Sequence, residues 1–261
     1  CNGKKEKEVV LDSSDLESQM IEAYNKGLKA LEEGDVLFAA KNFNTVENIY
    51  PQSIWAPRSV LMAAYSYYSQ DYYGDAISEL KRFLNNYPTN ENYPYAYFLI
   101  ATCYYELIVD EKKDLSAIIK SKEYYNIIVN KYPNTDFSLD AKFKLLMIDN
   151  ILASKEIYIG QFYVTKKKWI PAINRFKNVV ENFGETEYVE EALHRLVELN
   201  YILGLENEAK KYAVLLGYNY QSSDWYKESY RVFNKKYEDP IEKIKKDKQN
   251  FVIRKFKKLF K

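Results

Sequence analysis

The sequence predicts an all-α protein built from repeated helix pairs. One segment pattern returns at regular intervals along the 261 residues, and each copy ends in a helix stop. The chain also holds only 8 Gly and 7 Pro, fewer turn residues than a β-sandwich or barrel needs. With 47% hydrophobic and 29% charged residues, it has the composition of a folded domain and not of a disordered chain.

The repeat is defined by helix ends that close in Tyr-Pro, at Pro51, Pro88 and Pro133. Proline cannot continue a helix and biases the preceding residue away from helical geometry. A small residue lies twelve positions before each proline, a bulky residue lies eight before it, and another small residue lies further upstream. These are Ala39, Phe43 and Gly27, then Ala76, Leu80 and Ala64, then Ser121, Tyr125 and Ala101. Paired helices approach closely only where small side chains meet, so the pattern predicts tetratricopeptide-like repeats of about 34 residues.

Two more copies follow, which predicts a tetratricopeptide-repeat superhelix of about five helix-turn-helix repeats. The fourth copy carries Gly160, Ala172, Phe176 and Gly184, and a weaker fifth carries Val197, Gly204, Ala209 and Ala213. The third repeat holds eight additional residues near 109–114, which predict a charged loop. Apolar residues at helical spacing before the fourth repeat predict one long helix from about Ser138 to Thr165, joining two halves of the solenoid.

The predicted organisation has four parts. Residues 1–18 form a lipid-anchor and polar tether, 19–135 form repeats 1–3, 136–237 form repeats 4–5, and 238–261 form a basic amphipathic tail. The formal net charge is 38 − 37 = +1, but residues 240–261 alone carry nine Lys or Arg and two acids, or +7. The tail suits an anionic membrane or an acidic partner, and a solvated helix is the alternative.

The first residue, Cys1, predicts a processed chain end. Bacterial lipoproteins are cut immediately before a cysteine that then carries acyl chains, and the polar residues after Cys1 suit a tether. The alternative is a sequence boundary that falls at a cysteine. The second cysteine, Cys103, lies in an apolar helical pattern and is predicted to be buried. No run of 18 apolar residues predicts a membrane-spanning helix.

The residues needed for common enzyme chemistry are scarce. His194 is the one histidine, so a zinc site or a nucleophile–histidine pair is poorly supported, and a half-exposed position on a helix is expected for it. No phosphate-binding glycine motif occurs, and the carboxylates alternate with lysines as on solvated helix faces. The sequence therefore predicts no catalytic residue, no metal and no cofactor; a hydrolase built around His194 is a remote alternative.

Tyrosine is concentrated in the first three repeats: fifteen of the 26 tyrosines lie from Tyr50 to Tyr132. The first helix of each tetratricopeptide repeat lines the concave face, and tyrosine offers a large contact area with a hydroxyl for hydrogen bonding. The alternative is that many of these rings pack between helices. The predicted peptide groove is lined by Tyr24, Arg58, Leu61, Tyr65, Tyr68, Tyr95, Phe98 and Tyr105.

Four segments resemble a known family: YPQSIWAPR at 50–58, KWIPAINRF at 168–176, EEALHRL at 190–196 and LGYNY at 216–220. With the leading cysteine, they resemble the BamD family of β-barrel assembly lipoproteins, in the style of alphaproteobacterial members. The resemblance covers roughly residues 1–235.

This resemblance implies a lipid-anchored protein of the periplasmic face of the outer membrane, held there by N-terminal acyl chains. It implies that the C-terminal repeats dock on the POTRA domains of BamA, with Arg175 at the interface, and that other Bam lipoproteins bind as well. The N-terminal repeats would receive unfolded outer-membrane proteins. No nucleic acid is implied as a partner. The alternative is another lipoprotein adaptor that recruits envelope proteases or peptidoglycan enzymes.

Overall fold

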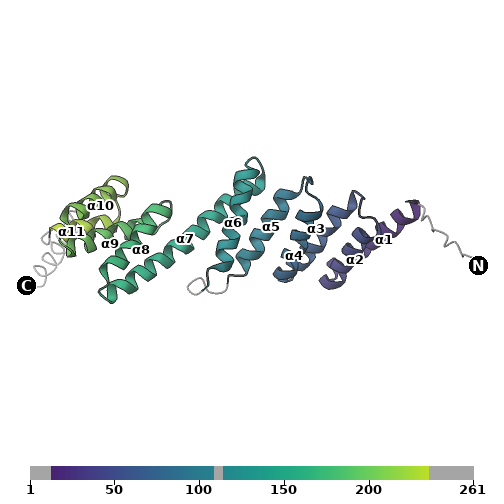
Figure 1. The fold of residues 1–261 in the computed structure, drawn as a ribbon, viewed down its shortest axis with the longest axis horizontal. Helices are drawn as coiled ribbons and strands as arrows, with labels where there is room; N and C mark the ends of the chain where they lie inside the picture. The colour runs from purple at the N-terminus through teal and green to yellow at the C-terminus, as the bar shows by residue number, and fades with distance from the viewer. Residues whose placement is uncertain (1–12, 109–113, 235–261) are drawn as a thin grey trace, which may run out of the picture. The chain divides into compact units, whose positions relative to one another are not determined.

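The computed structural model describes residues 13–108 and 114–234, and every regular element in these ranges is a helix (Figure 1). The predicted all-α fold class is therefore confirmed. The helices are α1 (Ser13–Glu32), α2 (Val36–Ile49), α3 (Trp55–Tyr68), α4 (Tyr73–Asn86), α5 (Tyr93–Glu106), α6 (Ser116–Lys131), α7 (Asp136–Thr165), α8 (Trp169–Asn182), α9 (Val189–Ile202), α10 (Glu206–Asn219) and α11 (Asp224–Phe233).

The small residues of the repeat lie where paired helices touch. A Cβ atom added at Gly27 in α1 would come within 2.8 Å of the Phe43 ring in α2. At Gly160 in α7 it would come within 2.6 Å of Phe176 in α8. In the third repeat the Ser121 hydroxyl donates to the carbonyl of Ala101, at 2.8 Å. In the first and fourth repeats the bulky residue thus fills the space that the small residue leaves, as the pattern predicts.

The Tyr-Pro pairs end the second helix of the first three repeats. Tyr50, Tyr87 and Tyr132 follow α2, α4 and α6, and each backbone N–H still donates to the carbonyl four residues earlier. The proline that follows has no N–H to extend the helix. The turns inside the first two pairs are short, and Asp35 caps α2 by accepting from the N–H of Phe38 at 3.1 Å.

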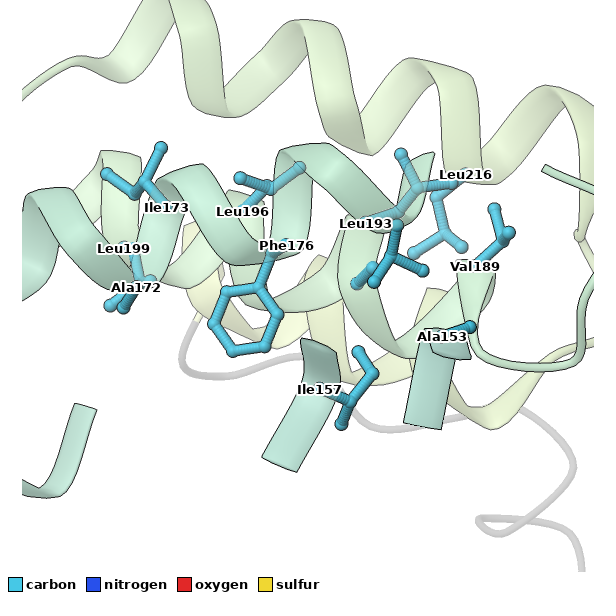
Figure 2. Packing of buried hydrophobic residues seen from close by; sticks show 12 residues of the cluster. Ala153, Ile157, Ala172, Ile173, Phe176, Val189, Leu193, Leu196, Leu199 and Leu216 are labelled. Carbon is cyan, nitrogen blue, oxygen red and sulfur yellow. The ribbon is translucent and has the colours of Figure 1, made fainter. Parts of the chain in front are cut away.

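The chain divides into two compact units, one up to Ile148 and one from Asp149 onward. In the first unit, one buried cluster joins α1, α2 and α3, and a second joins α3, α4 and α5. In the second unit a single cluster gathers side chains of α7, α8, α9 and α10 around Phe176 (Figure 2). The predicted long helix is present as α7, and the division falls within it.

The structure adds one helix, α11, to those that the sequence predicts. Helix α11 was not predicted; Ser223 caps it by accepting from the N–H of Tyr226 at 3.3 Å. The predicted loop near 109–114 lies outside the described residues except for Asp114, whose carboxylate accepts from the Ser116 N–H at 2.8 Å. Residues 13–18 of the predicted tether belong to α1, whereas residues 1–12 with Cys1 and the basic tail lie outside the described residues. Within the described ranges, no helix has the length and apolarity to cross a bilayer.

Candidate peptide groove and partner surface

A hollow of about 640 Å³ lies over α3 and the start of α5 in the first unit. Four residues of the predicted groove line it: Arg58, Leu61, Tyr65 and Tyr95. They come from two successive first helices, because positions three to four residues apart share one helix face. The other lining residues are Ile54, Pro57, Met62, Asn90, Glu91 and Asn92.

A smaller apolar hollow of about 230 Å³ lies beside it, between α1 and the start of α3. Tyr24, also predicted for the groove, lines this second hollow although its side chain is 8% exposed. The other lining residues are Met20, Ile21, Asn25 and Trp55. We call the two hollows together the aromatic groove. Its smaller part has the size and lining to receive one apolar side chain.

Arg58 lines the larger hollow and lies against two aromatic rings that line the smaller one. Its guanidinium carbon lies 5.5 Å from the centre of the Trp55 ring and 6.0 Å from that of Tyr24. These aromatic faces attract and position the cation. Among the described residues no carboxylate lies within ion-pair distance of Arg58, whose side chain is exposed. The groove therefore offers an unneutralised positive charge between apolar surfaces, and an anionic group of a ligand complements it.

Tyr95 contributes a hydroxyl group to the lining of the larger hollow. Its ring packs on Phe137 of α7 with centroids 5.8 Å apart. Burial, with a smaller effect from the neighbouring Tyr65, raises the pKa of Tyr95 to about 12. The hydroxyl thus stays protonated at physiological pH and can donate to a peptide carbonyl.

Three predicted groove residues do not line either hollow. Tyr68 packs against the buried cluster of α3, α4 and α5. The centre of the Phe98 ring lies 5.5 Å from that of the Phe137 ring. The Lys144 ammonium lies over the Tyr105 ring, 4.5 Å from its centre. Their role in ligand binding stays a prediction, and these contacts give them a packing role.

The turn between α4 and α5 supplies groove residues that the sequence reasoning missed. Asn90, Glu91 and Asn92 line the larger hollow. The Asn90 carboxamide oxygen accepts from the backbone and side-chain nitrogens of Asn92 at 2.9 and 3.1 Å, which fixes the turn. The polar sequence Asn90-Glu91-Asn92, which follows Pro88 after one residue, was the available signal. It could be placed beside α3 only through tertiary structure.

Arg175, predicted for the partner interface, lies on α8 beside a hollow of about 380 Å³. One nitrogen of its guanidinium, Nη1, donates to both carboxylate oxygens of Glu156 at 3.1 and 3.2 Å. The Arg175 side chain is 41% exposed and that of Glu156 is 16% exposed. The Arg175 guanidinium is therefore held at the surface by a carboxylate that is less exposed than the guanidinium itself.

The prediction that His194 is half-exposed is wrong, because the residue is 4% exposed. Its Nδ1 lies 2.9 Å from the Ser229 hydroxyl of α11, and its Nε2 lies 3.4 Å from Glu198. The ring also packs on Trp225, with centroids 5.2 Å apart. His194 and Ser229, which is 1% exposed, thus form a buried contact between α9 and α11, and the partly exposed Glu198 lies at its edge.

Cys103 is buried as predicted, and burial raises the pKa of its thiol to about 12. A thiol in that state is a poor nucleophile and metal ligand. Among the described residues, no three His, Cys, Asp or Glu side chains cluster as metal ligands.

Comparisons with known proteins give a family and several curated relatives. A family profile described as "Outer membrane lipoprotein" matches residues 16–215. The outer membrane protein assembly factor BamD of Rickettsia prowazekii is 39% identical over 232 residues, covering 89% of this chain and 90% of the relative. BamD of Caulobacter vibrioides is 37% identical over 235 residues, covering 90% and 76%.

Among solved structures, the "TPR2AB-domain:pHSP90-complex of yeast Sti1" has a TM-score of 0.44 and 15% identity, covering 83% of this chain and 82% of that one. The profile match and the two relatives each extend over most of the described chain. This chain therefore belongs to the outer membrane lipoprotein family whose members include the BamD assembly factors.

Proposed function

We propose that this chain is a non-enzymatic outer-membrane protein assembly factor, the role that the names of its relatives give to them. It receives unfolded outer-membrane proteins in the aromatic groove and docks through its C-terminal repeats on the POTRA domains of BamA, alongside other Bam lipoproteins. Acyl chains on Cys1 hold it at the periplasmic face of the outer membrane. An intact-mass measurement of the protein from native membranes tests this anchor, and an unmodified N-terminus would contradict it.

The observation that carries the proposal is the chemistry of the aromatic groove. An unfolded chain offers extended backbone, apolar side chains and, at its end, a carboxylate. The groove provides an apolar hollow, the Tyr95 hydroxyl, the Asn92 amide and the unneutralised Arg58. Tyrosines and an exposed arginine contact many different side chains with little loss of entropy, which suits a receptor for many sequences.

The test replaces two exposed groove residues, Tyr65 and Arg58. We expect Tyr65→Ala and Arg58→Gln together to weaken binding of a fluorescent peptide copied from a β-barrel protein C-terminus by roughly tenfold. This is the loss of one aromatic contact and one charge-assisted hydrogen bond. Fluorescence anisotropy measures the dissociation constant. Tyr68 and Phe98 are unsuitable for this test because truncating them removes helix packing.

Tyr218→Ala is the matched control, because this ring is 85% exposed and belongs to the second unit. It should leave peptide affinity unchanged. Circular dichroism should give the same melting temperature for the groove variant and the wild type. Wild-type affinity in the folded groove variant would rule out the aromatic groove as the receptor site.

A further inference from the structure

A hollow of about 530 Å³ in the second unit is lined by α10 and α11. Val214 and Tyr218, one turn apart on α10, contribute side chains that are 71% and 85% exposed. Helix α11 contributes Tyr226, Tyr230 and Phe233, which lie at helical spacing on one face. The remaining lining residues are Lys210, Ala213, Gly217, Gln221 and Ser229. Two apolar helix stripes therefore border one space, and a further helix can pack into it.

The order of the helices indicates what belongs beside α11. Each earlier first helix, from α1 to α9, is followed along the chain by the second helix of its pair. Within the described residues, α11 is a first helix without a second one, and Phe233 at its end lines the hollow. In a solenoid each repeat covers the apolar surface of the repeat before it, and the last repeat presents a polar outer face. The segment that follows α11 therefore begins beside the surface that needs covering.

The sequence after α11 carries the signals of one more helix. Asp239, Pro240 and Glu242 form a helix start, with a capping residue, a proline at the first helical position and an acid three residues after the cap. The stretch that follows is longer than the 14 residues of α10, so it can supply a complete second helix. Its apolar residues recur at helical spacing among lysines, and they are Ile241, Ile244, Phe251, Val252, Phe256, Leu259 and Phe260.

The hollow and this segment also match in the size of their side chains. In an earlier pair a small residue of the second helix lies in the contact, as Ala172 of α8 does in its buried cluster. Residues 240–261 contain no glycine and no alanine. The lining of the hollow supplies small residues instead, at Ala213 and Gly217. Bulky side chains of the segment can therefore enter the space that these small residues leave.

We propose that residues 240–261 form the second helix of a sixth repeat, with apolar side chains in the hollow of α10 and α11 and lysines toward solvent. The six linking residues, 234–239, reach at most about 22 Å when extended. So short a link gives the segment a local concentration on the order of millimolar at the hollow, which favours it over a bilayer or a separate protein. The inference does not depend on the proposed function.

The first test weakens the apolar face of the segment in the full chain. Ile244→Gln with Phe251→Gln should speed amide hydrogen exchange in α10 and α11 about tenfold, because two apolar side chains no longer fill the hollow. Lys243→Gln with Lys246→Gln is the matched control, since a helix places these lysines on the opposite face, and exchange should not change. Wild-type exchange rates in the Ile244 and Phe251 variant would overturn the inference.

Photocross-linking tests the contact independently of stability. With benzoylphenylalanine in place of Val214, illumination should join α10 to a peptide from residues 240–261 of the same chain, and mass spectrometry identifies the product. Lys211 is the control position, because its exposed side chain lies on α10 outside the lining of the hollow, and little of this product is expected there. A Val214 product without the segment, or one that joins two chains, would contradict the proposal.

Phosphatidylglycerol vesicles distinguish the hollow from a bilayer as the site of the segment, since an amphipathic basic helix also binds anionic lipid. The segment acts on the membrane if the Ile244 and Phe251 variant loses vesicle binding while exchange in α10 and α11, measured without vesicles, stays at the wild-type rate. That result would also overturn the inference. Faster exchange without vesicles supports the hollow, whether or not vesicle binding changes.

Discussion

Glycine at one position of the repeat decides how closely two helices can pack. Gly160 faces the fully buried ring of Phe176, and an added Cβ would lie 2.6 Å from a ring carbon. A buried ring cannot move aside without opening the cluster around it. Gly74, in the first turn of α4, has nothing within 4 Å of such a Cβ. The same substitution therefore has opposite expected effects at the two sites.

We expect Gly160→Ala to lower the free energy of unfolding by about 1–2 kcal/mol, since overpacking outweighs the gain in helix propensity. Gly74→Ala, the control, should be neutral or slightly stabilising. Urea unfolding measures both. Adding Phe176→Leu to Gly160→Ala should recover part of the loss. A Gly160→Ala protein as stable as the wild type would show that the helix pair tolerates a wider separation.

Glu47 illustrates what a repeat pattern does not contain. It is 6% exposed on α2, accepts from the Tyr87 hydroxyl at 2.7 Å and pairs with Arg82 of α4. This hydrogen bond gives Tyr87, which follows the last residue of α4, a structural contact with the preceding helix pair. Its carboxylate partner lies 40 residues away and is one of many acids on helix faces, so spacing alone could not single it out.

At the scale of elements, α11 depends on a polar contact with α9. Glu198 of α9 lies 2.8 Å from Arg195 and 3.4 Å from His194, which itself contacts Ser229 of α11. Burial by itself raises the pKa of Glu198, but the hydrogen bonds and charges of His194 and Arg195 outweigh it and hold the pKa at about 2, from an ordinary 4.5.

This depressed pKa predicts acid sensitivity of the second unit. The unfolded chain protonates Glu198 near pH 4.5 and the folded chain only near pH 2. The stability from its charge is therefore complete above about pH 4.5 and is lost as the pH falls toward 2. The difference in melting temperature between wild type and Glu198→Gln should be largest at pH 6 and shrink by pH 3.

Glu208→Gln is the control for the pH experiment. Glu208 forms an ion pair with Lys211 on α10, where both side chains are largely exposed. Exposed pairs of this kind contribute little, so a small and nearly constant difference from wild type is expected. A Glu198→Gln protein that followed the wild-type pH profile would mean that the carboxylate does not stabilise α11 through its charge.

At the scale of the whole molecule, the buried clusters are confined to one unit each. Phe43 belongs to a cluster of the first unit and Phe176 to that of the second. In repeat proteins each helix pair contacts mainly its neighbours, so stability is local. A core substitution should therefore unfold its own unit first.

We expect Phe176→Ala, a loss of about 3–5 kcal/mol, to speed amide hydrogen exchange in α8–α11 and leave α1–α4 protected. Phe43→Ala is the matched variant and should have the opposite distribution. Mass spectrometry of peptic fragments measures both. Uniform loss of protection throughout the chain, in either variant, would show instead that the two units unfold as one cooperative body.

The sequence alone predicts the helix pairs of the repeats and the ends of α2, α4 and α6, because periodicity, small residues and Tyr-Pro stops act over one repeat. It does not predict α11. It also pointed to five residues that line the aromatic groove, since first-helix positions recur at the repeat spacing. Only the tertiary structure brought Asn90 and Arg58 into the lining of one hollow and buried His194 against Ser229. These relations depend on how neighbouring repeats pack on one another, and that packing leaves no periodic mark in the sequence.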